Sequence, residues 1–220
     1  MSTTAAEFYP VAKDLPRVQV AAGATLQLLV VAADQYHCAG VDLASGALIR
    51  GWAPEPSESR PRPYDVVQVV LEGDVESIPD PAQPEALALI ESPRVVDRMT
   101  GRRCERLLRP LLHPRNQPLL GISGSAIPFW ERRGDHPSIA VVEPEGRVMF
   151  RRDGPYLACR FEWQGHQREL PCLDRSVAGH MDRNGRAVMS AGKGDRLVVA
   201  LTAPIDGRCH KVVETLLRRP

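Results

Sequence analysis

Short apolar runs separated by polar, glycine-containing or proline-containing turns recur along most of the chain. Residues 26–31 form an apolar run rich in strand-forming side chains, and a polar stretch at residues 34–37 ends it. A second strand is predicted at residues 38–43, and a turn at residues 44–46 separates it from a third at residues 47–50. Three short strands joined by tight turns are typical of the start of a small twisted antiparallel sheet or barrel.

The remainder of the first half alternates loops with apolar segments. Residues 53–63 are rich in Pro, Ser and charge and predict a surface loop, whereas residues 64–71 predict a strand. An acidic, proline-containing loop follows at residues 72–82. At the N-terminus, two prolines disrupt any regular run, so residues 1–23 predict a flexible arm.

Residues 92–110 carry the signals of a helix. Ser92 suits the N-cap and Pro93 the first helical position, while Pro110 disfavours helical geometry in the residue before it. We therefore expect one helix over about residues 93–109. The arginines of this segment are spaced so that they share one exposed face of such a helix: Arg98, Arg102, Arg106 and Arg109.

The second half repeats this style of alternation. Turns that contain Pro and Gly at residues 143–146 and 152–155 separate apolar segments. Strands are predicted at residues 139–142, 147–151, 156–163 and 197–202, and a strand or short helix at residues 209–217. The chain is therefore predicted to be mainly β, with a first unit at residues 24–118 and a second at residues 119–220.

Length and composition agree with this organisation. A chain of 220 residues suits one large domain or two of roughly 100 residues each. Hydrophobic residues make up 43% and charged residues 25%, which favours a folded globular chain. The five cysteines are widely spaced and form no C-x-x-C motif, so we expect small buried hydrophobic side chains rather than disulfides.

The net charge of +1 conceals an asymmetry along the chain. Residues 1–97 hold 6 Lys and Arg against 14 Asp and Glu, whereas residues 98–220 hold 22 against 13. A chain polarised in this way can present a cationic surface to a polyanion. The alternative is that the opposite charges face each other across a contact between the halves.

Signals for export and membrane insertion are not evident in the sequence. The N-terminal segment has no basic region followed by an apolar core. No apolar run approaches the roughly 20 residues that a membrane helix needs. We therefore expect a cytoplasmic chain with no membrane partner.

The order of several motifs resembles a known family. Residues 38–43 (CAGVDL) and 48–50 (LIR) are similar to the start of the dual OB-containing domain family, and residues 201–204 (LTAP) and 209–213 (CHKVV) are similar to its last motif. The resemblance implies two tandem OB-like small barrels with one intervening α-helix. It also implies nucleic-acid binding within a prokaryotic defence or nucleic-acid-processing system. The chain departs from the family's pattern in its longer N-terminal arm and in a shortened loop at residues 34–37.

Nucleic-acid binding needs cations for phosphates and aromatic faces for bases, and the second half offers both on neighbouring strands. Arg147 and Arg151 share one face of their strand, because alternate side chains point the same way. If the next strand pairs with this one as a hairpin, Tyr156 and Arg160 join the same face. The opposite face of the second strand is then expected in the core: Phe161 and Trp163. The alternative is an ordinary solvated sheet face with cross-strand Arg–Glu pairs.

Two further sets of side chains are candidates for the same function. The exposed ridge of the predicted helix offers Arg102, Arg106 and Arg109, whose alternative role is an ordinary solvated helix face. In the first half, three side chains lie near the loops where OB barrels commonly take ligand: Tyr36, Arg50 and Trp52.

The sequence contains no complete motif of the enzyme classes and metal sites considered below. Residues 121–125 lack the last Gly of G-x-S-x-G, and residues 192–194 lack the rest of a P-loop. His37-Cys38 and Cys209-His210 are adjacent pairs, whose side chains point to opposite faces of a strand and cannot easily chelate together. We therefore expect no catalytic residue, no metal and no cofactor.

These observations favour non-catalytic binding of DNA or RNA, single-stranded or structured, without sequence specificity. The resemblance adds a place as an accessory subunit with possible protein partners in a larger complex. The competing hypothesis is a protein–protein adaptor or scaffold subunit, in which the charge-polarised halves dock other subunits and no nucleic acid binds.

Overall fold

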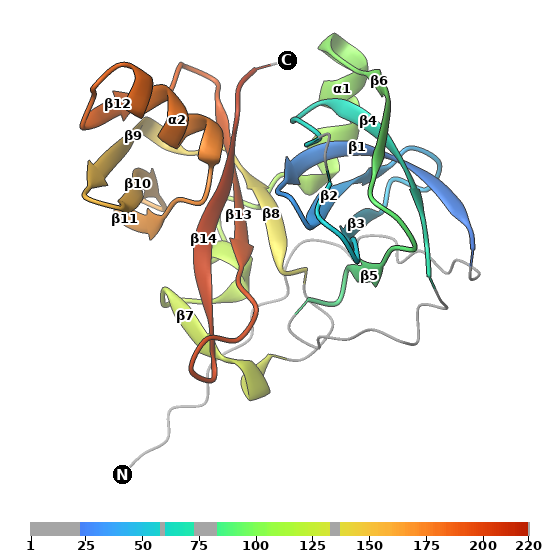
Figure 1. Ribbon diagram of the computed structural model, residues 1–220. Coiled ribbons are helices and arrows are strands. Elements are labelled where there is room, and N and C mark those ends of the chain that lie inside the picture. Colours follow the sequence, from blue (N-terminus) through green and yellow to red (C-terminus); the bar gives the residue numbers. More distant parts are fainter. Residues whose placement is uncertain (1–22, 58–59, 73–82, 133–136, 220) are drawn as a thin grey trace.

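The computed structural model describes residues 23–57, 60–72, 83–132 and 137–219. It is mainly β, as predicted from the sequence, with two short α-helices (Figure 1). The predicted flexible arm, apart from Gly23, and most of the predicted acidic loop at residues 72–82 lie outside the described residues.

Six strands form the first sheet, in the order β5-β3-β2-β1-β4-β6. Neighbouring strands are antiparallel, except that β3 and β5 run parallel. The strands are β1 Thr25–Ala33, β2 His37–Asp42, β3 Leu48–Trp52, β4 Asp65–Val70, β5 Ala86–Ala88 and β6 Arg94–Arg98.

Strand β1 is covered on both faces, which explains the unbroken apolar run in its sequence. Leu28 and Val30 belong to a core enclosed by the first sheet. Leu29 and Val31 point the other way, into a core that the first half shares with the second.

The first sheet curls until its two sides meet. Leu71, directly after β4, forms an antiparallel bridge with Leu89, directly after β5. The amide of Ile90 donates to the carbonyl of Val70 at 2.9 Å. Strand β5 therefore lies against β3 on one side and meets the end of β4 on the other.

The helix predicted at about residues 93–109 is wrong over its first part. Helix α1 covers only Gly101–Leu108, and Arg94–Arg98 instead forms β6 on the edge of the first sheet. Val95 lies opposite Val67 of β4, and β-branched side chains favour this extended pairing. Gly101, with a φ of +68°, takes the left-handed conformation that separates the strand from the helix.

The second half contains two four-stranded sheets, in the orders β11-β10-β9-β12 and β7-β14-β13-β8. The strands are β7 Ala126–Pro128, β8 Ile139–Val142, β9 Glu145–Asp153, β10 Tyr156–Trp163, β11 His166–Pro171, β12 Val188–Ser190, β13 Arg196–Leu201 and β14 Arg208–Leu217. Helix α2 covers Arg175–Arg183, and 3-10 turns cover Arg109–Leu111, Leu119–Gly121 and Phe129–Glu131. Because this half divides into two sheets, the layout of two tandem barrels remains a prediction.

The two sheets of the second half enclose one core. Cys172, after β11, forms a parallel bridge with Val213 of β14. Between the sheets lie the fully buried Phe150, Phe161 and Trp163, and the last two were expected there from the sequence. Helix α2, which the sequence analysis did not predict, starts at Asp174, whose carboxylate accepts the amides of Ser176 and Val177.

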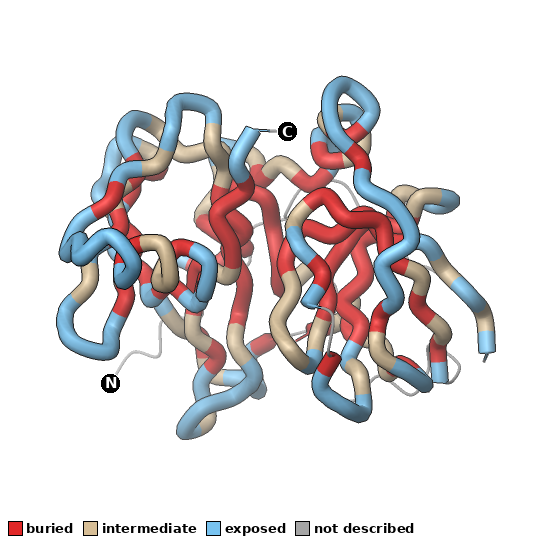
Figure 2. The backbone as a smooth tube through the Cα atoms, turned by 45° about the horizontal axis from the view of Figure 1, so that its top comes forward, coloured by how far each residue is buried: buried red, intermediate tan, exposed pale blue. Residues whose placement is uncertain are grey.

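The two halves share a hydrophobic core and a bound connecting segment. Strands β8, β13 and β14 lie between the first sheet and the β9–β12 sheet (Figure 1), and buried backbone runs through both halves (Figure 2). The shared core joins first-half residues to second-half residues such as Val141, Val198 and Leu217. In the connecting segment, the amide of His113 donates to the carbonyl of Val141 at 2.8 Å. The indole of Trp163 donates to the carbonyl of Gln117 at 3.1 Å.

All five cysteines are buried and free, as expected from their spacing. In the described residues, no helix is long and apolar enough to cross a membrane.

Candidate nucleic-acid interface

The predicted hairpin of β9 and β10 forms and gathers four candidate side chains on its outer face. Ala158 pairs with Arg151, and Arg160 pairs with Met149, in an antiparallel register. Arg151 therefore lies diagonally between Tyr156 and Arg160. Arg147 follows on the same face of β9, because it is two positions from Met149.

The aromatic ring at the end of this face is open to solvent. Tyr156 is 77% exposed, the highest value among the large apolar side chains described. It lies at the turn between β9 and β10, where Gly154 takes a φ of +57°. A ring in this position can offer its face to a nucleobase without any rearrangement of the core.

The three arginines of this face carry few local restraints. Nε of Arg147 donates to the hydroxyl of Ser190 at 3.0 Å. Nε of Arg160 lies 3.5 Å from the Glu169 carboxylate, and both side chains are more than half exposed. An exposed ion pair of this kind contributes about 0–1 kcal/mol, so a phosphate can displace the carboxylate at little cost.

The described carboxylates of the first half do not neutralise these arginines. Within the described residues, no carboxylate of the first half lies within ion-pair distance of Arg147, Arg151 or Arg160. Among the described residues, the ion pairs that do join the halves use other side chains: Arg50 with Glu214, His37 with Glu214, Arg196 with Glu105, and Arg115 with Glu143. Among the described residues, the alternative drawn from the charge asymmetry, in which arginines of the second half pair with carboxylates of the first, is therefore not seen on this face.

Arg50 is not available to a ligand, which corrects the prediction made for it. Its side chain is only 1% exposed and reaches into the second half. Nη2 lies 2.7 Å from the Glu214 carboxylate, and Nη1 donates to the carbonyl of Leu201 at 3.4 Å. Burial of a charge is tolerated here because the opposite charge is buried beside it.

Tyr36, before β2, and Trp52, at the end of β3, lie at one end of these strands and are partly exposed. The indole of Trp52 stacks on the imidazole of His37, with ring centroids 5.0 Å apart. Nδ1 of His37 lies 2.9 Å from the Asp34 carboxylate. Burial alone would lower the pKa of His37, but Asp34 and Glu214 outweigh burial and raise it to about 9. One face of Trp52 is thus occupied by a cationic ring.

The arginines of α1 are exposed but belong to a different part of the surface. Arg102, Arg106 and Arg109 are open to solvent on α1 and the turn after it. Helix α1 lies with the first half, whereas β9 and β10 lie across β8, β13 and β14 from it (Figure 1). Arg98, predicted to share their face, is on β6 and pairs with Asp65 at 2.6 Å.

The sequence analysis missed two groups that bear on the site. Strand β12 places Val188 beside Arg151, which extends the outer face by one strand. Strand β12 is only three residues long, and its alternation is too short to predict a strand. At the tip of the β13–β14 hairpin, Phe129, Trp130 and Ile205 are exposed, and Trp130 is 66% exposed. These aromatic side chains were visible in the sequence, but nothing there indicated that they would lie beside the hairpin.

Acidic and metal-ligating side chains form no competing site in the described residues. No three or more His, Cys, Asp or Glu side chains are grouped so that they could hold a metal ion. Among the acidic residues of the second half, Asp174 caps α2 and Asp195 accepts the amide of Gly192 at 2.8 Å. Asp182 pairs with Arg152. These contacts are structural.

Comparison with known proteins adds little to these observations. No protein-family model matches the chain, so the resemblance to the dual OB-containing domain family remains a prediction. The search of curated proteins also found no match. Among solved structures, the crystal structure of the tetrameric p202 HIN2 is similar over 92% of this chain and 94% of that chain. The sequence identity is 10% and the TM-score 0.32, which is too low to support a conclusion about fold or function.

Proposed function

We propose that this protein binds nucleic acid without catalysis, through the outer face of β9 and β10. The observation that carries the proposal is the placement of the exposed Tyr156 beside Arg151 and Arg160, with no first-half carboxylate to neutralise them in the described residues. Arginines neutralise phosphates, and an exposed ring stacks on bases of any sequence. The expected ligand is therefore DNA or RNA with accessible bases, bound without sequence specificity.

The strand order supports the further proposal that both halves are OB-type barrels. In such a barrel, three antiparallel strands are followed by two more that close a ring of five. The second half has this order if β9, β10 and β11 are its first three strands. Strands β12 and β13 together would then be the fourth strand, and β14 the fifth. The ring then closes through the Cys172–Val213 bridge and the pairing of β12 with β9. The first half closes through β3–β5 and the Leu71–Leu89 bridge.

The proposed barrel places the candidate residues where OB folds bind oligonucleotides. That surface is formed by the second and third strands, between the loop joining strands 1 and 2 and the loop joining strands 4 and 5. Here the second and third strands are β10 and β11. Tyr156 is at the first of these loops, and the exposed Trp130 lies against Gly207 at the second. A strand of nucleic acid that crosses β10 would therefore have an aromatic side chain near each end of its path.

The salt dependence of oligonucleotide binding tests the proposal directly. Neutralising phosphates releases counterions, and for single strands the slope of log K against log salt is about −0.7 for each phosphate contacted. Contacts from three arginines therefore predict a slope of about −2. Fluorescence anisotropy of a labelled single-stranded oligonucleotide of random sequence, at about 50 to 200 mM salt, measures it.

A variant with Arg147, Arg151 and Arg160 all changed to Ala should lose most of this slope. A matched control changes the exposed arginines Arg102, Arg103 and Arg106 of α1, which alters the net charge equally. If both triple variants lose binding equally, the face on β9 and β10 is not the interface. If the unchanged protein shows no binding at the lowest salt, the proposal of nucleic-acid binding is wrong.

One observation favours the competing role of a protein–protein adaptor. Phe129, Trp130 and Ile205 form an exposed apolar group at the tip of the β13–β14 hairpin, and such groups are common in protein interfaces. The further proposal that this chain is an accessory subunit of a prokaryotic defence or nucleic-acid-processing system belongs instead to the nucleic-acid-binding role and rests on the sequence resemblance. Trp130→Ser should weaken capture of a protein partner and leave the salt slope of oligonucleotide binding intact, because phosphate contacts set that slope and stacking does not.

A further inference from the structure

A pocket of about 220 Å³ opens between β11, the start of β14 and the segment that leads into β7. It exists because β11 pairs with β14 only at the Cys172–Val213 bridge, and the strands separate toward Gln167. Residues 118–125 border the gap without closing it. The pocket lining consists of Pro118, Leu119, Ile122, Ser123, Gly124, Ser125, Gln167, Arg168, Glu169, Leu170 and Lys211.

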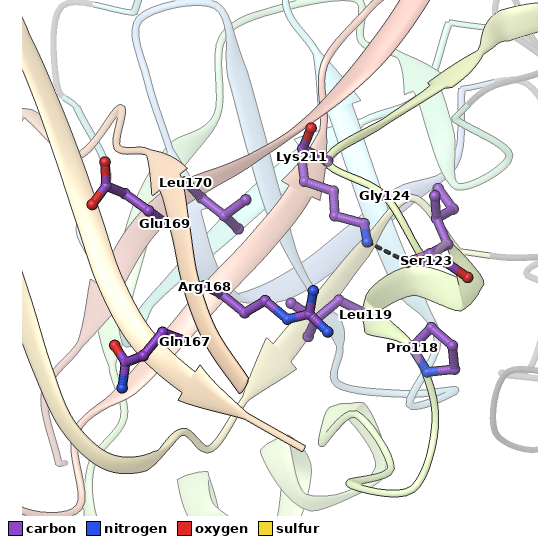
Figure 3. Close-up of a pocket in the computed structure, with 11 residues that line it drawn as sticks. Pro118, Leu119, Ser123, Gly124, Gln167, Arg168, Glu169, Leu170 and Lys211 are labelled. Atoms are coloured by element: carbon purple, nitrogen blue, oxygen red, sulfur yellow. Dashed lines mark hydrogen bonds between the residues drawn. The ribbon is translucent and has the colours of Figure 1, made fainter. Parts of the chain in front are cut away.

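Two cationic side chains enter this pocket from opposite walls. Figure 3 shows Lys211 reaching in from β14 and Arg168 from β11, with their nitrogen atoms directed toward the same space. Lys211 is only 4% exposed, and its Nζ donates to the carbonyl of Ile122. That neutral contact leaves the positive charge of Lys211 uncompensated.

Arg168 has fewer hydrogen bonds than its side chain can make. Nε of Arg168 is buried and has no hydrogen-bond partner among the described residues. Neither cation lies within ion-pair distance of a carboxylate in the part of the chain that the structure describes. Glu169, the acidic residue of the lining, points away from the pocket and pairs with Arg160 on the outer face (Figure 3).

The electrostatics of the pocket reflect the crowding of these charges. Burial and, as a smaller contribution, the positive charge of Arg168 together lower the pKa of Lys211 to about 7. The fold holds two positive charges close together in a half-enclosed site with no described carboxylate beside them. An anion that enters the site would stabilise both charges. Ser123 and Ser125 line the same pocket, and their hydroxyls can donate hydrogen bonds to a bound anion.

We propose that this pocket binds the dianion of a phosphate monoester, held between Lys211 and Arg168. Arg168 presents a planar set of donors that matches two phosphate oxygens, and Lys211 supplies a point charge. A terminal phosphate fits a pocket, whereas an internal phosphodiester must continue in both directions along an open groove. The dianion can belong to a free phosphate or to the end of a nucleic-acid strand. The proposal stands on the pocket alone and does not require the proposed function.

Binding of inorganic phosphate is the first test. Thermal unfolding of the full chain is followed in phosphate and in chloride of equal ionic strength, and the affinity is measured by calorimetry. A ligand that binds only the folded chain raises its unfolding temperature. We expect stabilisation by phosphate beyond that by chloride. Equal effects of the two ions would overturn the proposal.

Variants of the two cations locate the binding site. Lys211→Met and Arg168→Gln each remove one charge-assisted contact, and each should weaken phosphate binding about tenfold to hundredfold. Arg168 is only partly buried, so its variant remains informative if Lys211→Met fails to fold. Arg103→Ala, at an exposed position of α1 outside both proposed sites, removes the same charge and should leave phosphate affinity unchanged. Equal losses in all three variants would show a diffuse charge effect and contradict the proposal.

Two short DNA strands of identical sequence, one with a 5′-phosphate and one with a 5′-hydroxyl, distinguish the sources of the phosphate. Tighter binding of the phosphorylated strand, lost in Arg168→Gln, assigns the pocket to strand ends. Equal binding of both strands, with phosphate affinity retained, assigns it to a free phosphate monoester. If neither strand binds but inorganic phosphate does, the pocket proposal holds and the proposed function fails.

Discussion

The guanidinium of Arg50 on β3 lies 2.7 Å from the carboxylate of Glu214 on β14, and so one buried ion pair ties the first sheet to the second half. Nε2 of His37 lies 3.6 Å from the same carboxylate. Burial alone would raise the pKa of Glu214, but Arg50 and His37 outweigh burial and lower it. The pair therefore stays charged within the protein, and each buried charge is stabilised by the other.

Glu214→Gln should destabilise the whole chain by about 3–5 kcal/mol, because it leaves the buried charge of Arg50 without a partner. Urea unfolding measures the change through the midpoint of the transition. The double variant Arg50→Met, Glu214→Leu should lose less than Glu214→Gln, since no unpaired charge remains. Glu143→Gln is the matched control, because its pair with Arg115 is exposed and should contribute at most about 1 kcal/mol.

The raised pKa of His37 predicts a loss of stability in alkaline solution. Its pKa is about 9 in the folded protein, against 6.5 for an ordinary histidine, so the folded state holds the proton more tightly. The contribution of His37 is complete below about pH 6.5 and is lost as the pH rises through about 9. One pKa unit corresponds to about 1.4 kcal/mol, so the contribution is at most about 3.5 kcal/mol.

Lys211 opposes this trend, which makes variants necessary for the measurement. Its pKa is lowered to about 7 from 10.5, so the unfolded chain binds more protons and stability rises with pH between these values. The difference in unfolding free energy between the unchanged protein and His37→Gln isolates His37. That difference should shrink between pH 6 and pH 10. A constant difference would show that folding does not raise the pKa of His37.

Tyr156→Ala should weaken binding of single-stranded oligonucleotides about 5-fold to 150-fold, which corresponds to the 1–3 kcal/mol of one stacked base. Its unfolding free energy should change by no more than about 0.5 kcal/mol, because the ring is exposed. Tyr156→Phe should retain binding, since stacking needs only the ring. Tyr36→Ala is the matched control on the first sheet, and a larger loss there would move the interface to that half.

Gly40→Ala should destabilise the chain by about 1–3 kcal/mol through overpacking. A Cβ at this position would lie 2.6 Å from the carbonyl oxygen of Leu29, where β1 and β2 approach closely. Gly124→Ala is the control, because its Cβ would have no neighbour closer than 3.6 Å. Urea midpoints of the two variants provide the comparison, and similar values would contradict the close packing of β1 on β2.

Local pattern was enough to predict much of the second half. The turns around Gly146 and Gly154 and the alternation between Arg147 and Trp163 depend only on neighbouring residues, and the hairpin formed as expected. The buried ring of Trp163 follows from the same alternation. Local signals of this kind survive because both strands of the hairpin are adjacent in sequence.

Features that depend on distant partners were not accessible from the sequence. Arg50 was taken for a surface cation because its partner Glu214 is 164 residues away. Ser92-Pro93 resembled a helix start, but pairing with β4 made the following residues a strand. Helix α2 was missed because its nine residues hold only two buried side chains, Val177 and Met181, which is a short pattern to recognise, although Asp174 marks its start. The pocket between Lys211 and Arg168 exists only through the separation of β11 from β14.

The core that contains Leu29, Val141 and Val198 belongs to both halves at once. A fragment that ended after the connecting segment would expose this apolar surface to water and would be prone to aggregate. The chain should therefore unfold in one cooperative transition rather than half by half. A ligand on β9 and β10 would then protect amide hydrogens in β1 from exchange, although it touches none of them.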